Sequence, residues 1–199
     1  MQSRCEERDF SGYNAAQADR PVRPLAVAAV EAVDLESASA PRMAIELGCG
    51  RGVEARFLAE NGFSVLTFDA DRSIEPLLVE LGQVLPITHS SIDLARISAL
   101  PPAHLVLSCA TLPFVRREAF PALWRSIRES LRPGGVLAVD LFGDRDDWAA
   151  TDGTFLTRDE VEELLRGLEV VDLVEEECEG RSFSGAKHWH TYRVVARRS

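Results

Sequence analysis

The amino-acid sequence predicts an α/β fold built on a doubly wound, mostly parallel sheet. Short apolar segments typical of strands alternate with amphipathic segments typical of helices, and this alternation places helices on both faces of a parallel sheet. A glycine-rich turn at residues 48–52 directly follows the first of these strands. Two strand-like segments joined by a Gly/Ser loop close the chain, which predicts a hairpin with one antiparallel strand in the sheet.

The first half of the chain begins with a polar segment over residues 1–24. Its Gly12, Pro21 and Pro24 are typical of a segment outside the core. The pair Asn61-Gly62 is a stop signal for the helix before it. In chain order we expect a helix near 25–33, a strand over 43–47, a helix over 53–61, a strand over 63–68, a helix over 73–81 and a weak strand near 86–89.

The second half continues the alternation of strands and helices. Thr157 and Glu160 have the spacing of a capping box, which predicts a helix that begins there and runs to about residue 165. Pro133-Gly134-Gly135 predicts a turn that leads into a strand. In chain order we expect a strand over 104–110, a helix over 118–131, a strand over 136–142, the capped helix, and final strands near 169–177 and 188–196 with a hairpin loop over 179–187.

Length and composition limit the possible functions. The chain has 199 residues, of which 46% are hydrophobic, and this is enough for one domain with a proper core. The formal net charge of −10 argues against nucleic-acid binding, because such binding depends on neutralising phosphates. Cys5, Cys49, Cys109 and Cys178 form no CxxC pair and have no zinc-like spacing, so we expect free thiols and no bound metal.

The N-terminus carries no recognisable targeting signal. Its first residues are charged and no apolar segment follows them, so we expect no signal peptide. No apolar run approaches the roughly 20 residues that span a bilayer. We therefore expect a cytoplasmic protein that does not bind a membrane.

Gly48, Gly50 and Gly52 occupy three of five positions, which indicates that something approaches this backbone closely. In a strand–turn–helix unit of this kind, a ligand lies against backbone N–H groups. The third glycine comes one residue earlier than in the GxGxxG fingerprint of dinucleotide-binding proteins, so no pyrophosphate site is implied. Asp69 ends the second strand and is placed to accept both hydroxyls of a ribose, a feature that nicotinamide and other adenosine cofactors share. A tight turn without a ligand is the alternative.

The segment "ELGCGRG" (46–52) and the later Asp69 resemble the cofactor motif of class I S-adenosylmethionine-dependent methyltransferases. The segments "SIDLA" (91–95) and "SLRPGGVLAV" (130–139) are similar to further motifs of those enzymes. The chain more narrowly resembles the small TehB-like (tellurite-resistance) methyltransferases, in the segments "LSCATLPFV" (107–115), "LFGDRDDWA" (141–149) and "KHWHTYRVVARR" (187–198). The resemblance runs over nearly the whole chain.

This resemblance implies a Rossmann-like, doubly wound, seven-stranded sheet with the order 3-2-1-4-5-7-6, in which strand 7 is antiparallel. It also implies one methyltransferase domain over residues 1–199, with an N-terminal flap (1–24) on a core (25–199), and S-adenosylmethionine as the cofactor. By position, Glu46 would hold the amino end of the cofactor and Asp69 its ribose. The other implied cofactor-binding residues are Leu47, Gly48, Gly50, Gly52, Ala70, Asp93 and Ser108, with Tyr13, Arg20 and Arg23 from the flap.

Ligands of such sheets lie beyond the carboxyl ends of the parallel strands. Cys109 and Phe114 follow the fourth strand and Trp148 follows the fifth, so we expect these residues to bind the methyl acceptor. The last strand runs the other way, and its beginning brings His188 and His190, which share a face, to the same edge. One hypothesis is that a neutral imidazole of this pair positions or deprotonates the acceptor. The alternative is a structural role for both histidines.

Together these features favour a methyltransferase that acts on a small molecule by in-line displacement, with an O, S, N or chalcogen acceptor atom. The segment "SCATLPF" (108–114) lacks the Asn/Asp-Pro-Pro-aromatic motif of amino-methylating members, which argues against nucleic-acid or protein amines as acceptors. Two alternatives stay open. One is a nicotinamide-dependent oxidoreductase, which the early third glycine opposes, and the other is a non-catalytic regulatory protein that only binds the cofactor.

Overall fold

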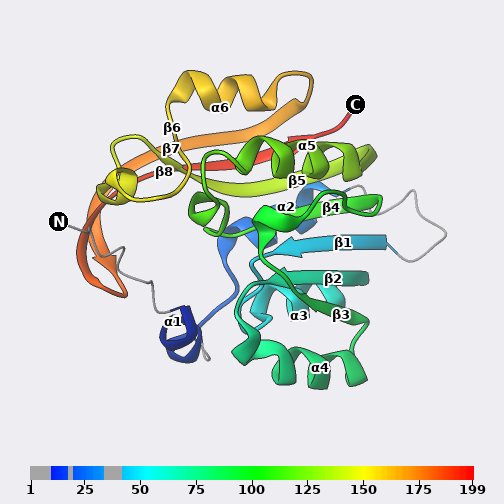
Figure 1. The fold of residues 1–199 in the computed structure, drawn as a ribbon. Coiled ribbons are helices and arrows are strands. Elements are labelled where there is room, and N and C mark those ends of the chain that lie inside the picture. Colours follow the sequence, from blue (N-terminus) through cyan, green and yellow to red (C-terminus); the bar gives the residue numbers. More distant parts are fainter. Residues whose placement is uncertain (1–9, 18–19, 34–41) are drawn as a thin grey trace.

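The computed structural model describes residues 10–17, 20–33 and 42–199, which form one mixed sheet with helices on both faces (Figure 1). The strands follow the order β3-β2-β1-β4-β5-β8-β7, and the short β6 pairs with β5. Their bounds are β1 (Arg42–Leu47), β2 (Phe63–Asp69), β3 (Ile87–Ser91), β4 (Ala103–Ser108), β5 (Leu131–Gly143), β6 (Phe155–Leu156), β7 (Glu169–Ser182) and β8 (Gly185–Arg197).

Apart from α1, which falls in the segment expected to be a flap, the helices lie where the sequence predicts them, with small shifts at their ends. Their bounds are α1 (Phe10–Ala16), α2 (Pro24–Ala32), α3 (Val53–Glu60), α4 (Glu75–Val84), α5 (Phe120–Ser130) and α6 (Arg158–Leu165). The capping box of α6 is confirmed, since Thr157 and Glu160 bond reciprocally. Helix α4 begins later than expected because Arg72–Ile74 forms a 3-10 turn, which the Asp71 side chain caps.

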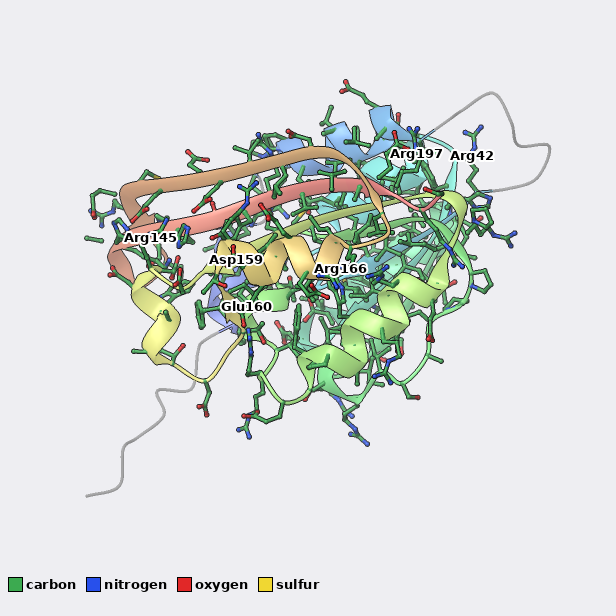
Figure 2. All side chains as sticks on the ribbon, turned by 90° about the horizontal axis from the view of Figure 1, so that it is seen from above. Arg42, Arg145, Asp159, Glu160, Arg166 and Arg197 are labelled. Carbon is green, nitrogen blue, oxygen red and sulfur yellow. The ribbon has the colours of Figure 1, made fainter. Side chains whose placement is uncertain are left out.

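The predicted sheet topology is confirmed. When the two-residue β6 is set aside, the observed order is the expected 3-2-1-4-5-7-6, and the last strand, β8, is antiparallel to β5. Strands β1 to β5 pair in parallel, so their carboxyl ends meet at one edge. In Figure 2, Arg42 and Arg197 lie at one end of the sheet, whereas Arg145 lies at the other, beyond the carboxyl ends of the parallel strands.

Apolar side chains from the two faces of the sheet form two separate clusters, because successive strand residues point to opposite faces. One cluster combines residues of α2, α3 and α4 with Ala44, Leu107 and Ala138 of the sheet, and this side is called face one below. The other combines residues of α5 and α6 with Leu47 and Tyr192, and this side is called face two.

The C-terminal hairpin is longer than expected. The predicted loop over 179–187 is wrong, because β7 continues to Ser182 and pairs with β8 up to Gly185. Polar side chains face each other across this part of the hairpin, with Glu177 opposite His190 and Glu179 opposite His188, and such cross-strand pairs favour continued pairing. The hairpin thus extends past the sheet and curves toward α1 (Figure 1), where the Phe183 ring lies 6.1 Å from that of Tyr13.

The predicted turn at Pro133-Gly134-Gly135 is also wrong in part. Strand β5 already begins at Leu131, which pairs with Ala103, and an irregularity in the register separates this pair from the rest of the ladder.

Within the described residues, we find no helix with the length and apolar character that crossing a bilayer requires. Cys5 and residues 1–9 of the expected flap lie outside the described residues.

Candidate functional site

The glycine turn between β1 and α3 uses most of its own backbone donors. The Gly48 N–H donates to the Phe68 carbonyl at 2.7 Å, and the Gly52 N–H donates to the Cys49 carbonyl at 2.9 Å. The Gly50 N–H donates to the Asp69 carboxylate at 2.9 Å. A phosphate cradle requires free N–H groups that point outward. This turn therefore does not offer the donors that a pyrophosphate would need.

All three of these glycines have positive φ, and at Gly48 and Gly50 a Cβ would come closer than 3.0 Å to a neighbour from another element. At Gly48 (φ +79°), a Cβ would lie 2.0 Å from the hydroxyl of Thr111, a residue in the segment after β4. At Gly50 (φ +47°), a Cβ would lie 2.9 Å from the side-chain oxygen of Asn14 in α1. Any larger residue would therefore push α1 and the segment after β4 away from the turn. The glycines keep three elements in contact at the edge of the sheet.

Asp69 connects the turn to the end of β2. Its Oδ2 accepts from the Gly50 N–H, and its Oδ1 accepts from the Asp71 N–H, each at 2.9 Å. A carboxylate has about four acceptor sites, so two remain for further donors such as the hydroxyls of a ribose. The Asn14 side chain donates to Asp71 at 2.8 Å, which holds α1 over this corner.

Glu46 is the most unusual polar residue of the site. It is 1% exposed on β1, beneath the glycine turn, and its Oε2 has no hydrogen-bond partner. Burial raises the pKa of its carboxyl well above the usual value, and the nearby charges of Glu54 and Asp69 act in the same direction, while Arg20 opposes them. A buried acceptor without a partner is costly, so this oxygen is suited to a cationic or hydrogen-bond-donating ligand.

The N-terminal residues expected to form a flap lie beside Glu46 and α3. Arg20 forms a double hydrogen bond with the buried Glu54 carboxylate, which also accepts from the Arg23 backbone N–H at 3.1 Å. The Arg23 guanidinium donates to the Tyr13 hydroxyl at 2.9 Å. Arg20 is therefore committed to Glu54, whereas Tyr13 and Arg23 form the wall toward the hairpin.

The remaining predicted cofactor residues lie along the same edge. Ser108 is fully buried and donates to the Leu47 carbonyl at 2.9 Å, so its hydroxyl joins β4 to β1. Ala70 is exposed directly after β2. Asp93 is exposed and caps a 3-10 turn by accepting from the Ala95 N–H at 2.9 Å. The structure brings Asp69, Ala70 and Asp93 to one corner, and the roles of all these residues stay predictions.

Aromatic rings cluster beyond the carboxyl ends of β4 and β5. The Phe114 ring lies 5.8 Å from Trp148 and 5.3 Å from Phe10 of α1, and Trp148 lies 5.6 Å from Trp189 of β8. The predicted acceptor residues Phe114 and Trp148 thus share one aromatic wall. Cys109 is buried on face one, and burial raises the pKa of its thiol well above the usual value, which disfavours a thiolate.

Lys187, the only lysine of the chain, organises this wall, and the sequence analysis missed it. Its ammonium pairs with the buried Asp146 carboxylate and lies 3.6 Å from the centre of the Trp189 ring and 4.3 Å from that of Trp148. Asp146 also accepts from the His190 backbone N–H. The segment after β5 is therefore fixed to β8 by a buried ion pair. A lone lysine among aromatic residues was the only signal in the sequence.

The two histidines lie on face two, whereas Glu46 and Cys109 lie on face one. His190 is fully buried, its Nδ1 accepts from the Arg145 backbone N–H at 3.2 Å, and its Nε2 lies 3.0 Å from the Glu175 carboxylate. This geometry favours the structural alternative for His190. A catalytic role for it stays a prediction.

His188 lies between two carboxylates at the edge of the hairpin. Its ring nitrogens lie 2.6 Å from Glu179 and 2.9 Å from Glu177. These hydrogen bonds raise the pKa of His188 above its usual value, because they favour the charged ring. This shift of the pKa runs against the expected neutral imidazole at His188, and a catalytic role for it stays a prediction.

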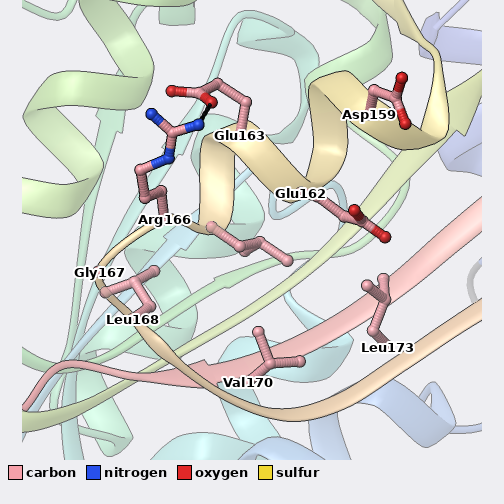
Figure 3. A pocket seen from close by; sticks show the side chains of 9 residues that line it. Asp159, Glu162, Glu163, Arg166, Gly167, Leu168, Val170 and Leu173 are labelled. Atoms are coloured by element: carbon pink, nitrogen blue, oxygen red, sulfur yellow. Dashed lines mark ion pairs between the residues drawn. The ribbon is translucent and has the colours of Figure 1, made fainter.

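A surface groove of about 530 Å³ lies elsewhere, between α6 and β7 (Figure 3). Its polar lining includes Asp159, Glu162 and Glu163, and Arg166 pairs with Glu163. None of the groove's lining residues belongs to the glycine turn or to the ends of β1, β2 and β4. It is therefore not part of the candidate cofactor site. Among the described residues there is also no group of three or more His, Cys, Asp or Glu placed to hold a metal.

Comparison with known families decides the relationship of the chain. Residues 20–181 match the sequence model of the family described as tellurite resistance protein TehB. The chain belongs to this family. The family expected from the sequence is confirmed, and the match spans the glycine turn, Asp69 and the first strand of the hairpin up to residue 181. A search of curated protein sequences finds no significant match.

Solved structures share the fold at low sequence identity. The structure of TehB from Haemophilus influenzae is similar with a TM-score of 0.77 and 18% identity, covering 96% of this chain and 67% of that one. A 1,6-didemethyltoxoflavin-N1-methyltransferase from Burkholderia thailandensis, solved with its namesake compound and S-adenosylhomocysteine, has a TM-score of 0.69 and 19% identity, covering 95% and 83%. The magnesium protoporphyrin IX methyltransferase from Synechocystis PCC 6803, with bound S-adenosylmethionine, has a TM-score of 0.66 and 14% identity, covering 96% and 91%.

Glu46→Gln separates a ligand-binding role from a structural role. We expect it to weaken S-adenosylhomocysteine binding roughly tenfold or more, because a charge-assisted hydrogen bond is lost. Because the pKa of Glu46 is raised, the native carboxyl lowers the free energy of unfolding as the pH rises through that pKa. The substitution removes this cost, so the melting temperature of the variant at pH 8 should not fall below that of the wild type. Calorimetry and thermal melts measure both effects, with the exposed Glu60→Gln as control. A lower melting temperature with unchanged affinity would assign Glu46 to the fold alone.

His190→Ala tests the structural alternative for the histidine pair. We expect the melting temperature to fall by roughly 5–10 °C, because the Arg145 N–H loses its acceptor and a cavity opens beside Gly143. The affinity for S-adenosylhomocysteine should stay within about twofold of the wild type. His188→Ala, at the exposed edge, is the matched control and should change neither quantity strongly. A His190→Ala protein with wild-type stability would speak against the structural role and return the residue to the mechanism.

Proposed function

We propose that this chain is an S-adenosylmethionine-dependent methyltransferase that acts on a small molecule in the cytoplasm. The observation that carries the proposal is the buried, unpartnered Glu46 carboxylate oxygen beneath a glycine turn whose own N–H groups are largely occupied. This arrangement suits a ligand with a cationic amino end. Membership in the TehB family and the fold of the solved methyltransferases support the proposal.

The same observation separates this proposal from a nicotinamide oxidoreductase. A dinucleotide would place two negative phosphate charges on the turn, where Glu46, Glu54 and Asp69 already supply carboxylates. Arg20, the cation that acts on the buried Glu46, is paired with Glu54. S-adenosylmethionine carries no phosphate, and both its amino group and its sulfonium are positive. The electrostatics of the turn therefore favour it over a dinucleotide.

The cofactor would supply an activated methyl group, and the chain would bind and align it. In this proposal, Glu46 and the turn hold the methionyl end, Asp69 accepts from the ribose hydroxyls, and Asp93 with Ala70 faces the adenine. Because the methyl donor is already activated, alignment of the acceptor accounts for much of the rate enhancement. The acceptor would lie against the wall formed by Phe114 and Trp148.

A non-catalytic regulatory protein is the second candidate. It shares the cofactor site but requires no open acceptor position. The aromatic wall is held by the Lys187–Asp146 ion pair close to where a methyl group would emerge, and this favours an enzyme. The two candidates differ in one observable property, which is methyl transfer to any member of a broad panel of small acceptors.

Ligand binding by Asp69→Asn tests the cofactor assignment. We expect wild-type protein to bind S-adenosylhomocysteine by calorimetry and to show no heat with NAD or NADP. Asp69→Asn should lower that affinity roughly 10- to 100-fold, because the ribose loses charge-assisted hydrogen bonds. Asp159→Asn on the distant α6 is the matched control and should bind normally. Tight NAD binding, or an unchanged affinity in Asp69→Asn, would contradict the assignment.

A further inference from the structure

Asp140 is a carboxylate at the sheet edge that the function described above leaves unused. In the ladder between β4 and β5, Ser108 is the last residue of β4 and pairs with Val139. Asp140 therefore stands one step further along β5, at the level of Cys109, where β4 has ended and β5 continues. This is the carboxyl edge of the sheet, where ligands of such folds bind.

The side chain of Asp140 belongs to face one. Val136 and Ala138 of the same strand pack in the face-one cluster, and strand alternation places Asp140 with them. Glu46 is on that face too, since its neighbour Ala44 packs in the same cluster. The two carboxylates thus lie on the same side of the sheet, on strands separated only by β4. His188 and His190 lie on the other side.

The charged groups around Asp140 leave its carboxylate without an ion-pair partner. Among the described residues, no cation lies within 4 Å of it in an ion pair, although Arg23 and Arg193 are close enough to favour its charge. Arg193 stands opposite on β8, but its guanidinium extends to Asp172 of β7, at 3.9 Å. Arg23 donates to the Tyr13 hydroxyl.

The surroundings also set the protonation of Asp140. Burial raises the pKa of its carboxyl to about 6, while Arg23, Arg193 and the Ala110 N–H oppose the rise and Glu54 of α3 adds to it. The carboxyl is therefore ionised near pH 7 but can take up a proton there at little cost. This is the behaviour required of a general base. Ala110, whose φ is +53°, turns the chain after β4 beside this group.

We propose that Asp140 binds the hydrogen-bearing atom of the methyl acceptor and takes its proton, so that the enzyme methylates neutral or cationic N–H or O–H compounds rather than oxyanions. The inference rests on the methyltransferase function proposed above and adds the substrate class. It differs from the histidine hypothesis, because Asp140 lies on the face that carries Glu46.

The reaction step balances without a further reactant. A lone pair of the acceptor atom forms the bond to the methyl carbon, and the carbon–sulfur bond breaks with its electron pair staying on sulfur. In a neutral acceptor the proton passes to the Asp140 carboxylate as the new bond forms, whereas a protonated amine gives one proton to Asp140 first, which frees the lone pair. Asp140 later releases the proton to solvent. The net products are the methylated acceptor, S-adenosylhomocysteine and one proton.

The charge of the site explains the selectivity. Glu46, Asp69 and Asp140 stand on strands β1, β2 and β5 at the ligand edge of the sheet, and the cation Arg20 is already paired with Glu54. An oxyanion acceptor would be repelled by these carboxylates and would have to compete with Asp140 for Arg23. A donor of hydrogen bonds, or a protonated amine, would be stabilised by them.

Three probes that share one ring test this selectivity directly. Benzylamine, benzyl alcohol and benzoate differ mainly in charge and in the presence of a donor. Their binding to the wild-type complex with S-adenosylhomocysteine is measured by calorimetry or by the fluorescence of Trp148 and Trp189. We expect benzylamine to bind at least tenfold more tightly than benzoate at pH 7.5. We expect Asp140→Asn to reduce that preference to less than threefold.

The dependence on pH identifies the responsible group. In wild-type protein, benzylamine affinity should rise through an apparent pKa near 6 as Asp140 ionises, whereas benzyl alcohol affinity should stay nearly constant. Asp140→Asn should abolish the rise. Asp159→Asn, which changes a carboxylate on the distant α6, is the matched control and should keep the wild-type profile.

The outcomes separate this inference from the proposed function. If wild-type protein does not bind S-adenosylhomocysteine, the proposed function fails. If it does, and Asp140→Asn keeps that affinity but loses the preference for benzylamine, the inference is supported. Equal or tighter binding of benzoate, an unchanged preference in Asp140→Asn, or no measurable binding of any of the three probes overturns the inference alone. Methylation of selenite or tellurite at rates above those of amine and phenol acceptors would also overturn it.

Discussion

The hydrogen bond from the Gly50 N–H to the Asp69 carboxylate is the constraint around which the candidate site is arranged. It ties the turn after β1 to the end of β2, and the other turn donors then close on Phe68 and on Cys49. The turn is therefore rigid before any ligand arrives, and it has little left to offer an anion. What remains is acceptor capacity on Asp69 and on Glu46, which suits a cationic ligand with hydroxyl groups.

The carboxyl edge of this sheet concentrates negative charge on a single face. Glu46 and Asp140 are carboxylates whose pKa values burial raises, and their strands lie on either side of β4. Such groups lower the stability of the fold, since the charged forms are poorly solvated, and they are common at sites that bind or transform ligands. The buried ion pair of Lys187 with Asp146 works differently, because it fixes the aromatic wall rather than leaving a charge available.

Periodicity and local signals predicted the alternation of strands and helices, the capped α6 and the glycine turn, because these depend on residues close together in the chain. The strand order was implied by the resemblance to class I methyltransferases. Local patterns could not show that the hairpin continues to Ser182, since that depends on pairing across two strands. Local patterns also could not show which face of the sheet each side chain of the hairpin takes. They indicated that the histidines lie at the ligand edge, but not that His190 packs against Gly143 on face two. Asp140 gave no signal of its own, because its environment comes from Arg23, Glu54 and Ala110.

A titration of isotopically labelled protein with S-adenosylhomocysteine, followed through the backbone amide resonances, tests the central claim most directly. The account predicts that the largest shifts fall on residues 47–52 and 69–71, with smaller ones at 93 and 108–111. Amides that line the groove between α6 and β7 should not move. Shifts centred on that groove, or saturating binding that leaves the Gly50 and Asp69 amides unchanged, would contradict the claim that the glycine turn is the cofactor site.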